Sequence, residues 1–175
     1  MKNIVLIGFM GAGKTTVGEV LSQKLGRIFV DCDTLIEKRI GQTIAEIFAQ
    51  KGEDFFRKLE RECIEEICQR EDQVIACGGG AVLDPQNVER LKRSGLIFLL
   101  SLPLSGLEER LTLDQDRPLL QEKERGKRIK ELWEEREKKY LTAADQVVEV
   151  KNMSAEEIAD LIIRNYRKLV KEVEP

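Results

Sequence analysis

Near its amino end the sequence reads Gly8-Phe9-Met10-Gly11-Ala12-Gly13-Lys14-Thr15, which matches the pattern G-x-x-x-x-G-K-[ST] at every fixed position. An apolar run over residues 2–7 precedes this segment and predicts a strand, and a helical pattern over residues 14–25 follows it. A glycine-rich turn between a strand and a helix lets backbone N–H groups converge on phosphate oxygens, and the helix N-terminus adds positive potential. A fortuitous glycine-rich turn is the alternative, but the complete motif in this context favours a phosphate-binding loop.

Strand and helix patterns alternate along the rest of the chain. Further strands are predicted over residues 27–31, 74–77, 96–100 and 146–150. Helical patterns cover residues 34–40, 43–50, 53–70, 85–93, 104–111 and 127–140. Asp84 and Pro85 mark the start of one helix, and Ser154-Ala155-Glu156-Glu157 is a capping box that opens a terminal helix. Because strands that are apolar throughout belong to sheets covered on both faces, we predict an α/β three-layer sandwich with a five-stranded parallel sheet, in a single domain over residues 1–175.

The composition excludes several chemistries. The chain has no histidine, so Ser-His-Asp hydrolysis, Cys-His proteolysis and histidine-ligated zinc cannot be its activities. A formal net charge of −3 gives no bias toward polyanions, so nucleic acid is not an expected partner. The longest apolar runs, residues 4–7 and 96–100, are far shorter than the roughly 20 residues of a membrane helix. The four cysteines form no C-x-x-C pair, so we expect reduced thiols in a cytoplasmic protein with no membrane partner.

The phosphate loop also indicates the chemistry of the nucleotide site. Lys14 is expected to reach the β- and γ-phosphates, and the Thr15 hydroxyl is expected to bind Mg²⁺. The chain lacks the D-x-x-G and N-K-x-D motifs of Ras-type GTPases, which favours ATP, and it is too small for an oligomeric motor ATPase. Phosphoryl transfer to a small acceptor is therefore the leading class of reaction.

Two carboxylates follow the second predicted strand. Asp31 and Asp33 are two residues apart, so their side chains can point to the same side at the strand's carboxyl end, toward the nucleotide. One could hold Mg²⁺ through water while the other accepts a proton from an acceptor hydroxyl. Asp33 also stands directly before a helical pattern, where it could serve simply as an N-cap, and the spacing favours neither interpretation.

Arginines occupy the inward faces of two predicted helices. Arg57 and Glu60 continue the apolar face of the helix over residues 53–70, and Arg136 lies on the inward stripe of the helix over residues 127–140. Inward arginines can clamp a carboxylate or a phosphate. The more common arrangement is a packed stem whose charged head reaches water, and without other information that alternative is favoured.

The polar segment over residues 112–124 is predicted to be a long loop, and its length indicates a function. Arg117 within it could close over transferring phosphates as part of a lid. An ordinary surface charge is the alternative, and it is what most loop arginines are.

Six motifs together resemble those of the shikimate kinase family, in order and in spacing over nearly the whole chain. They are Gly8-x-x-Gly11-x-Gly13-Lys14-Thr15, Asp31-x-Asp33, Phe56-Arg57-x-x-Glu60, Gly78-Gly79-Gly80-Ala81, Arg117-Pro118-Leu119 and Arg136. The resemblance implies the nucleoside monophosphate kinase fold, with an acceptor-binding insertion over residues 33–61 and a lid over residues 112–124. It further implies that a monomer, with Mg²⁺, transfers the γ-phosphoryl group of ATP to the 3-hydroxyl of shikimate, in chorismate and aromatic amino acid biosynthesis.

The same resemblance implies a role for each matching residue. The residues that would bind ATP are Gly11, Ala12, Gly13, Lys14, Thr15, Thr16, Arg110 and Arg117, with Arg110 near the adenine. Thr15 would bind Mg²⁺, and Asp31 would hold it through water. The residues that would bind shikimate are Asp33, Arg57, Glu60, Gly78, Gly79, Gly80 and Arg136. Within that set Arg57 and Arg136 would clamp the carboxylate, and Glu60 would orient Arg57. The catalytic groups would be Lys14, Asp33 and Arg117, with Asp33 taking the acceptor hydroxyl.

One position departs from the family pattern. Family members often have a basic residue near the adenine after the last strand, where this chain has Lys151-Asn152-Met153. The resemblance therefore leaves the adenine contacts at these three residues open.

Two other functions stay open on the sequence. Another kinase with a phosphate loop, for gluconate or a nucleoside monophosphate, would share the loop but should not accept shikimate. A nucleotide-binding regulatory module would retain the fold without catalysis, although Lys14, Asp33 and Arg117 argue against it.

Overall fold

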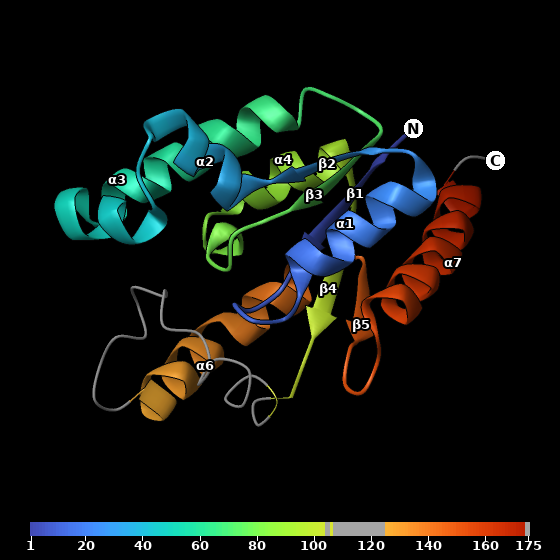
Figure 1. Ribbon diagram of the computed structural model, residues 1–175. Helices are drawn as coiled ribbons and strands as arrows, with labels where there is room; N and C mark the ends of the chain where they lie inside the picture. Colours follow the sequence, from blue (N-terminus) through green and yellow to red (C-terminus); the bar gives the residue numbers. More distant parts are fainter. Residues whose placement is uncertain (104–105, 107–124, 174–175) are drawn as a thin grey trace.

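Five parallel strands form the centre of the structure, a computed structural model that describes residues 1–103, 106 and 125–173 (Figure 1). The strands are β1 (Asn3–Ile7), β2 (Ile28–Asp31), β3 (Gln73–Ala76), β4 (Gly95–Ser101) and β5 (Gln146–Glu149). Their spatial order is β2-β3-β1-β4-β5, and every neighbouring pair is parallel. The central strand β1 is buried along its whole length, as expected when both faces of a parallel sheet are covered. The predicted α/β fold is therefore confirmed.

Helices cover both faces of the sheet. They are α1 (Lys14–Leu25), α2 (Cys32–Ile40), α3 (Ile44–Ile67), α4 (Pro85–Ser94), α6 (Arg125–Ala143) and α7 (Ala155–Val173), with a 3₁₀ turn η1 (Ala81–Leu83). The helices α1 and α7 pack together on one face, and α3 and α4 pack together on the other (Figure 1). The helix α6 contacts β4 and η1. The helix predicted over residues 104–111, apart from Gly106, and the loop over residues 112–124 lie outside the described residues.

Local signals set where several helices begin. Gly13 adopts a left-handed conformation with φ 92°, which turns the chain from the phosphate loop into α1. Asp84 caps α4 with its side chain and Pro85 is the first residue of that helix, as predicted. The Ser154 hydroxyl accepts a hydrogen bond from the Glu157 N–H at 3.2 Å, and the Glu157 carboxylate accepts one from the Ser154 N–H at 2.7 Å. These two bonds confirm the capping box before α7.

The two helices predicted over residues 43–50 and 53–70 form the single element α3, which is broken at Gly52. Gly52 has φ 79° and ψ 173°, a conformation that is essentially restricted to glycine. The rings of Phe48 and Phe56 lie 4.9 Å apart between centroids, whereas a straight helix would separate two such residues by about 12 Å along its axis. The break therefore folds the first part of α3 back toward the second.

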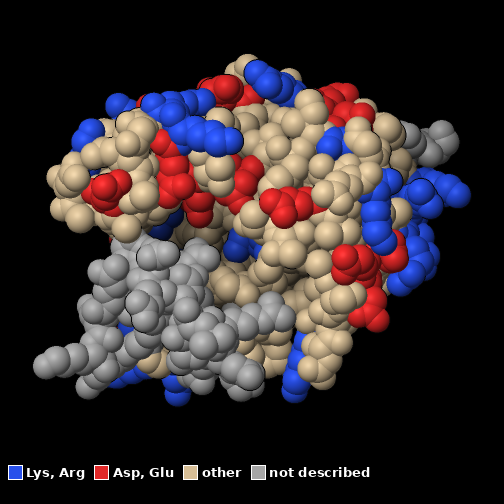
Figure 2. All heavy atoms as spheres, in the orientation of Figure 1, with Lys and Arg blue, Asp and Glu red and all other residues tan. Residues whose placement is uncertain are grey.

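The face shown in Figure 2 carries charges of both signs, and the four cysteines are not paired with one another. None of the helices in the described part of the chain is long and apolar enough to cross a membrane. Acidic and basic side chains are interspersed over the face shown in Figure 2. Cys32, Cys63, Cys68 and Cys77 are free thiols, as predicted, and all but Cys68 are buried.

Candidate active site

The candidate site lies where three adjacent strands end. The phosphate loop follows β1, Asp31 is the last residue of β2, and residues 78–80 follow β3. Ligands of open parallel sheets bind outside the carboxyl ends of the strands. The sheet order confirms that these three segments meet at one edge, as the sequence predicts.

The phosphate loop and the start of α1 line a pocket, which we call the phosphate pocket. The residues that line it are Gly11, Gly13, Lys14, Thr15, Thr16, Asp31, Asp33, Cys77 and Gly79. The Lys14 ammonium donates hydrogen bonds to the carbonyl oxygens of Gly8 at 2.9 Å and Phe9 at 3.0 Å, so it lies folded over the loop. Ala12 is 1% exposed and does not line the pocket. A glycine-rich loop at a helix N-terminus with a lysine at its mouth is suited to binding a phosphate chain.

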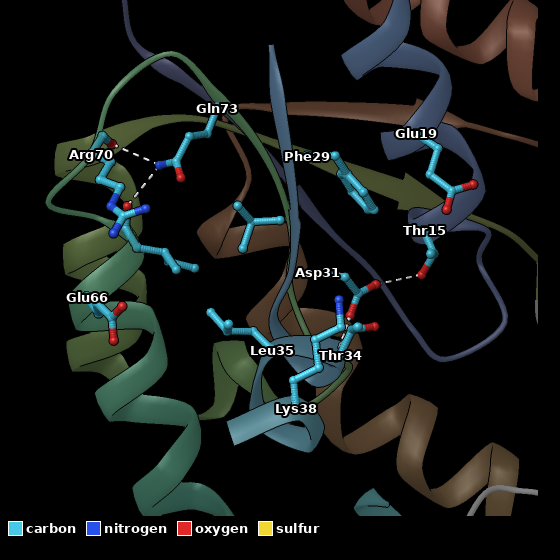
Figure 3. Close-up of a pocket in the computed structure, with 12 residues that line it drawn as sticks. Thr15, Glu19, Phe29, Asp31, Thr34, Leu35, Lys38, Glu66, Arg70 and Gln73 are labelled. Carbon is cyan, nitrogen blue, oxygen red and sulfur yellow. Dashed lines mark hydrogen bonds between the residues drawn. The ribbon is translucent and has the colours of Figure 1, made fainter. Parts of the chain in front are cut away.

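Thr15 and Asp31 bring two kinds of oxygen atom together at this pocket. The Thr15 hydroxyl donates a hydrogen bond to the Asp31 carboxylate at 2.8 Å (Figure 3). The other carboxylate oxygen of Asp31 accepts a hydrogen bond from the Thr34 N–H at 3.1 Å. Both side chains also line a separate hollow beside the edge strand β2, outside the phosphate pocket, which Figure 3 shows. Hydroxyl and carboxylate oxygens are ligand types that Mg²⁺ prefers, so the chemistry of this pair fits that ion.

Asp33 lies in a different local structure from the one predicted. The strand β2 ends at Asp31 and α2 begins at Cys32, so Asp31 and Asp33 do not share one face of a strand. The N-cap of α2 is Asp31 rather than Asp33, because its carboxylate accepts the Thr34 N–H. Both carboxylates line the phosphate pocket nonetheless, and Asp33 reaches it from the first turn of a helix.

A second pocket adjoins the first. The residues that line it are Met10, Asp33, Ile44, Phe48, Phe56, Arg57, Glu60, Gly78, Gly79, Gly80 and Arg136. Ile44, Phe48 and Phe56 supply an apolar wall, and Arg57 and Arg136 supply two cations. Such a pocket suits a small ligand that has an apolar ring face and a negative group.

Two carboxylates of its own helix hold Arg57 in place. The Arg57 Nη1 donates to Glu60 at 2.9 Å, and its Nε and Nη2 donate to Glu53 at 3.2 and 2.8 Å. Burial raises the pKa of Glu60 above its ordinary value, Arg57 opposes the rise, and the Asp33 carboxylate adds to it. Because Glu53 and Glu60 hold the guanidinium of Arg57 from two sides, its remaining N–H groups point in a fixed direction.

Arg136 is almost completely buried, with 3% of its surface exposed. Its Nη1 donates a long hydrogen bond to the Gly79 carbonyl at 3.4 Å, and its Nε has no hydrogen-bond partner within the described residues. A buried cation with an unsatisfied N–H is costly unless a ligand completes it. The alternative favoured on pattern alone, a packed stem with a solvated head, is therefore wrong for Arg136.

The glycines after β3 allow the backbone to lie directly against charged groups. A Cβ on Gly78 would lie 2.7 Å from Asp33 Oδ1 and 3.0 Å from Glu60 Oε1. A Cβ on Gly80 would overlap the Arg57 guanidinium. The run of glycine is therefore required by close approach rather than by left-handed backbone, since neither Gly78 nor Gly80 has a positive φ.

The sequence patterns do not reveal the apolar part of the second pocket. Ile44 and Phe48 are four residues apart, a spacing that normally indicates a buried stripe, and no local signal distinguishes a pocket wall from a core. Phe56 stands beside Arg57 in one of the six motifs, and that adjacency is the signal that could have identified it. Met10 occupies a variable position of the phosphate-loop pattern.

Several candidate residues are not placed at the site. Arg110 and Arg117 lie outside the described residues, as does the predicted lid over residues 112–124. Residues 151–153 follow β5 and line neither of the two pockets in the described structure.

The two pockets share two residues, Asp33 and Gly79. A phosphate chain on the loop and an acceptor beside Arg57 and Arg136 would therefore meet at the Asp33 carboxylate. Direct transfer of a phosphoryl group needs this juxtaposition of donor and acceptor, with charged groups arranged around both.

Comparison with known proteins agrees with this geometry. The family model described as shikimate kinase matches residues 10–167. The shikimate kinase of Thermodesulfovibrio yellowstonii is 47% identical over 169 residues, which cover 97% of this chain and 97% of that protein. A solved shikimate kinase from Acinetobacter baumannii, in complex with shikimate, has a TM-score of 0.92 at 36% identity and covers 99% of this chain and 95% of its own. For the Aquifex aeolicus shikimate kinase the TM-score is 0.85 at 37% identity, with 96% and 98% covered. Because the matched region contains every residue that lines the two pockets, and the relatives align over nearly the whole chain, this protein belongs to the shikimate kinase family.

Proposed function

We propose that this chain transfers the γ-phosphoryl group of ATP to the 3-hydroxyl of shikimate, giving ADP and shikimate 3-phosphate in chorismate and aromatic amino acid biosynthesis. The proposal depends on one observation above all, the meeting of a phosphate-loop pocket and a two-arginine pocket at Asp33 and Gly79. The related enzyme from Acinetobacter baumannii, which binds shikimate, supports the choice of acceptor.

On the nucleotide side, residues 11–16 would bind the phosphates of ATP. Lys14 would leave the loop carbonyls to contact the β- and γ-phosphates, a short movement because its ammonium already lies at the mouth of the loop. Thr15 would bind Mg²⁺ and Asp31 would hold it through water. When bound, that ion neutralises charge on the phosphates.

On the acceptor side, the carboxylate of shikimate would bind Arg57 and Arg136. Planar guanidinium groups suit a carboxylate because they can donate two parallel hydrogen bonds to it. Glu60 would keep Arg57 oriented, and the backbone of residues 78–80 would lie along the ring. Asp33 would accept the hydrogen bond of the 3-hydroxyl and take its proton as the new P–O bond forms.

The remaining assignments follow the family pattern. Arg117 would close with a lid over residues 112–124, and Arg110 would lie near the adenine. Residues 33–61 would form the acceptor-binding insertion of one kinase domain that spans residues 1–175. We expect a cytoplasmic monomer with no nucleic acid or membrane partner.

An assay that couples ADP release to a chromogenic reaction tests this function. Protein with ATP, Mg²⁺ and shikimate should release ADP and yield shikimate 3-phosphate, identified by mass spectrometry, whereas gluconate and nucleoside monophosphates should not support turnover. Turnover with one of those acceptors but not with shikimate would replace the proposed substrate. Nucleotide binding without acceptor-dependent ADP release would indicate a regulatory module instead.

Gly80→Ala is expected to raise KM for shikimate about tenfold while KM for ATP stays within about twofold. The added Cβ would overlap the Arg57 guanidinium, which must swing away, whereas the backbone at Gly80, with φ −105°, accommodates alanine. Steady-state kinetics with each substrate varied in turn measures both constants. Gly126→Ala is the matched control, because a Cβ there meets no atom of the described residues within 4 Å. An unchanged shikimate KM in Gly80→Ala would contradict the role assigned to Arg57.

A further inference from the structure

The carbonyl group of Gly79 receives hydrogen bonds from two side chains of α6. The Tyr140 hydroxyl donates to it, and Arg136, one helical turn earlier, donates from Nη1 at the longer distance of 3.4 Å. Gly79 lines both pockets, so this carbonyl lies where the two proposed substrates meet. Tyr140 itself lines neither pocket, and the mechanism above does not use it.

The direction of the Tyr140 hydroxyl is fixed by packing. Its side chain is 1% exposed, and its ring lies against Trp133 with centroids 6.5 Å apart. Trp133 in turn makes an edge contact with Phe9 of the phosphate loop at 5.7 Å. Burial raises the pKa of Tyr140 to about 12, so the phenol remains a neutral hydrogen-bond donor at physiological pH.

Fixing this carbonyl also fixes the groups on either side of it. Because the peptide group is planar and trans, the direction of the Gly79 carbonyl sets that of the Gly80 N–H. The Gly80 Cα in turn packs against the Arg57 guanidinium. A buried carbonyl without a good donor is costly, so it would draw in whatever donor lies nearest. If Tyr140 did not satisfy it, that donor would be Arg136.

We propose that Tyr140 is a positioning residue that satisfies the Gly79 carbonyl and thereby leaves the guanidinium of Arg136 available to the carboxylate of the acceptor. The inference rests on the proposed function, because it assigns Arg136 to shikimate. The long Arg136–Gly79 distance and the unpartnered Nε of Arg136 agree with a guanidinium that is not committed to the backbone in the described structure.

Tyr140→Phe removes the hydroxyl and keeps the ring, and the chain offers a matched control. Tyr166 is also a buried helical tyrosine, at 7% exposed, and its hydroxyl donates to a backbone carbonyl, that of Lys2, at 2.6 Å. Tyr140→Phe should raise KM for shikimate about tenfold and leave KM for ATP within about twofold, whereas Tyr166→Phe should change neither. The Tyr166 hydroxyl also accepts a hydrogen bond from Arg27 at 3.2 Å, so the melting temperature of Tyr166→Phe should fall at least as far as that of Tyr140→Phe.

A binding measurement separates positioning from effects on turnover. Trp133 is the single tryptophan of the chain and contacts Tyr140, so its fluorescence can report shikimate binding directly. The dissociation constant should rise with KM in Tyr140→Phe. The combined variant Arg136→Met/Tyr140→Phe should bind shikimate no more weakly than Arg136→Met alone, because Tyr140 acts through Arg136.

Three results would overturn the inference. They are an unchanged shikimate KM in Tyr140→Phe, equal rises in the two KM values, and independent, multiplicative effects in the combined variant. Failure of the proposed function is distinct from these, because the wild-type protein and Tyr166→Phe would then also show no shikimate-dependent ADP release, and the positioning role would fall with it.

Discussion

Lys14→Met is expected to reduce kcat by at least about a hundredfold while leaving the fold intact. Lys14 is the one cation among the described residues that line the phosphate pocket, and its ammonium already lies over the loop. Transfer of the γ-phosphoryl group requires neutralisation of the negative charge on the phosphates, which a methionine side chain cannot provide. Removing one preorganised group of this kind costs about 10²–10³ in rate. Measurement of ADP release at saturating shikimate, beside a thermal melt, gives the activity and the fold.

Lys24→Met makes the same chemical change on the same helix, away from the pocket. Lys24 forms a surface ion pair with Asp160 at 2.6 Å, and exposed pairs contribute little to stability. Its turnover should match that of the wild type. Near wild-type turnover in Lys14→Met would sink the proposed mechanism, and so would a comparable loss of turnover in both variants.

Arg136→Met is expected to lower kcat/KM for shikimate about a hundredfold, which corresponds to about 3 kcal/mol, mostly through KM. The substitution keeps much of the side-chain volume and removes the buried cation that would face the substrate carboxylate, so that carboxylate loses one of its two partners. KM for ATP should stay near its wild-type value. Kinetics with each substrate varied separately tests the assignment.

The stability of the same variant distinguishes a substrate clamp from a structural arginine. The Arg136 charge is buried in the free protein with its Nε unpartnered in the described structure, and what the charge supplies there is one long hydrogen bond to Gly79 and an attraction that opposes the burial-driven rise in the pKa of Glu60. Removing the charge should therefore lower the melting temperature only slightly. Arg128→Met is the control, because Arg128 lies on the same helix, is 38% exposed in its side chain and pairs with Glu131 at 3.5 Å. A fall of several degrees in the melting temperature of Arg136→Met, with unchanged shikimate KM, would assign Arg136 to the fold instead.

Much of the fold follows from local physical requirements that the sequence displays. The phosphate loop needs glycines where its backbone turns, and Gly13 has the left-handed conformation that the motif implies. The inner strands β3, β1 and β4 are buried on both faces and almost wholly apolar, which made the parallel arrangement predictable, although the edge strands β2 and β5 are partly exposed. The caps at Asp84 and Ser154 were predictable for the same reason, because each depends on neighbours only a few residues away.

Features that depend on distant contacts were not predictable in this way. Asp31 takes the N-cap position of α2 with one carboxylate oxygen while the other accepts a hydrogen bond from Thr15 of α1. No local pattern shows that second partner. The start of α2 and the local structure around Asp33 were predicted wrongly for another reason, since Asp31 and Asp33 both stand close to the helical pattern and the sequence does not show which of them is the cap. The hydrogen bond of Tyr140 was not predictable either, because its helical spacing indicates only a core aromatic residue. The contact with the Gly79 carbonyl arises only when the fold brings that residue against α6.

The break at Gly52 has an evolutionary consequence. Ile44 and Phe48 precede it and shape the apolar wall, whereas Arg57 and Glu60 follow it and hold the charged groups. The two segments remain in contact, because the Phe48 ring packs on the Phe56 ring across the break and Arg57 lies over Phe56. A lineage that altered the ring-facing wall at Phe48 would therefore also shift the neighbourhood of Arg57, so the shape of ring that the pocket admits and its requirement for a carboxylate should change together.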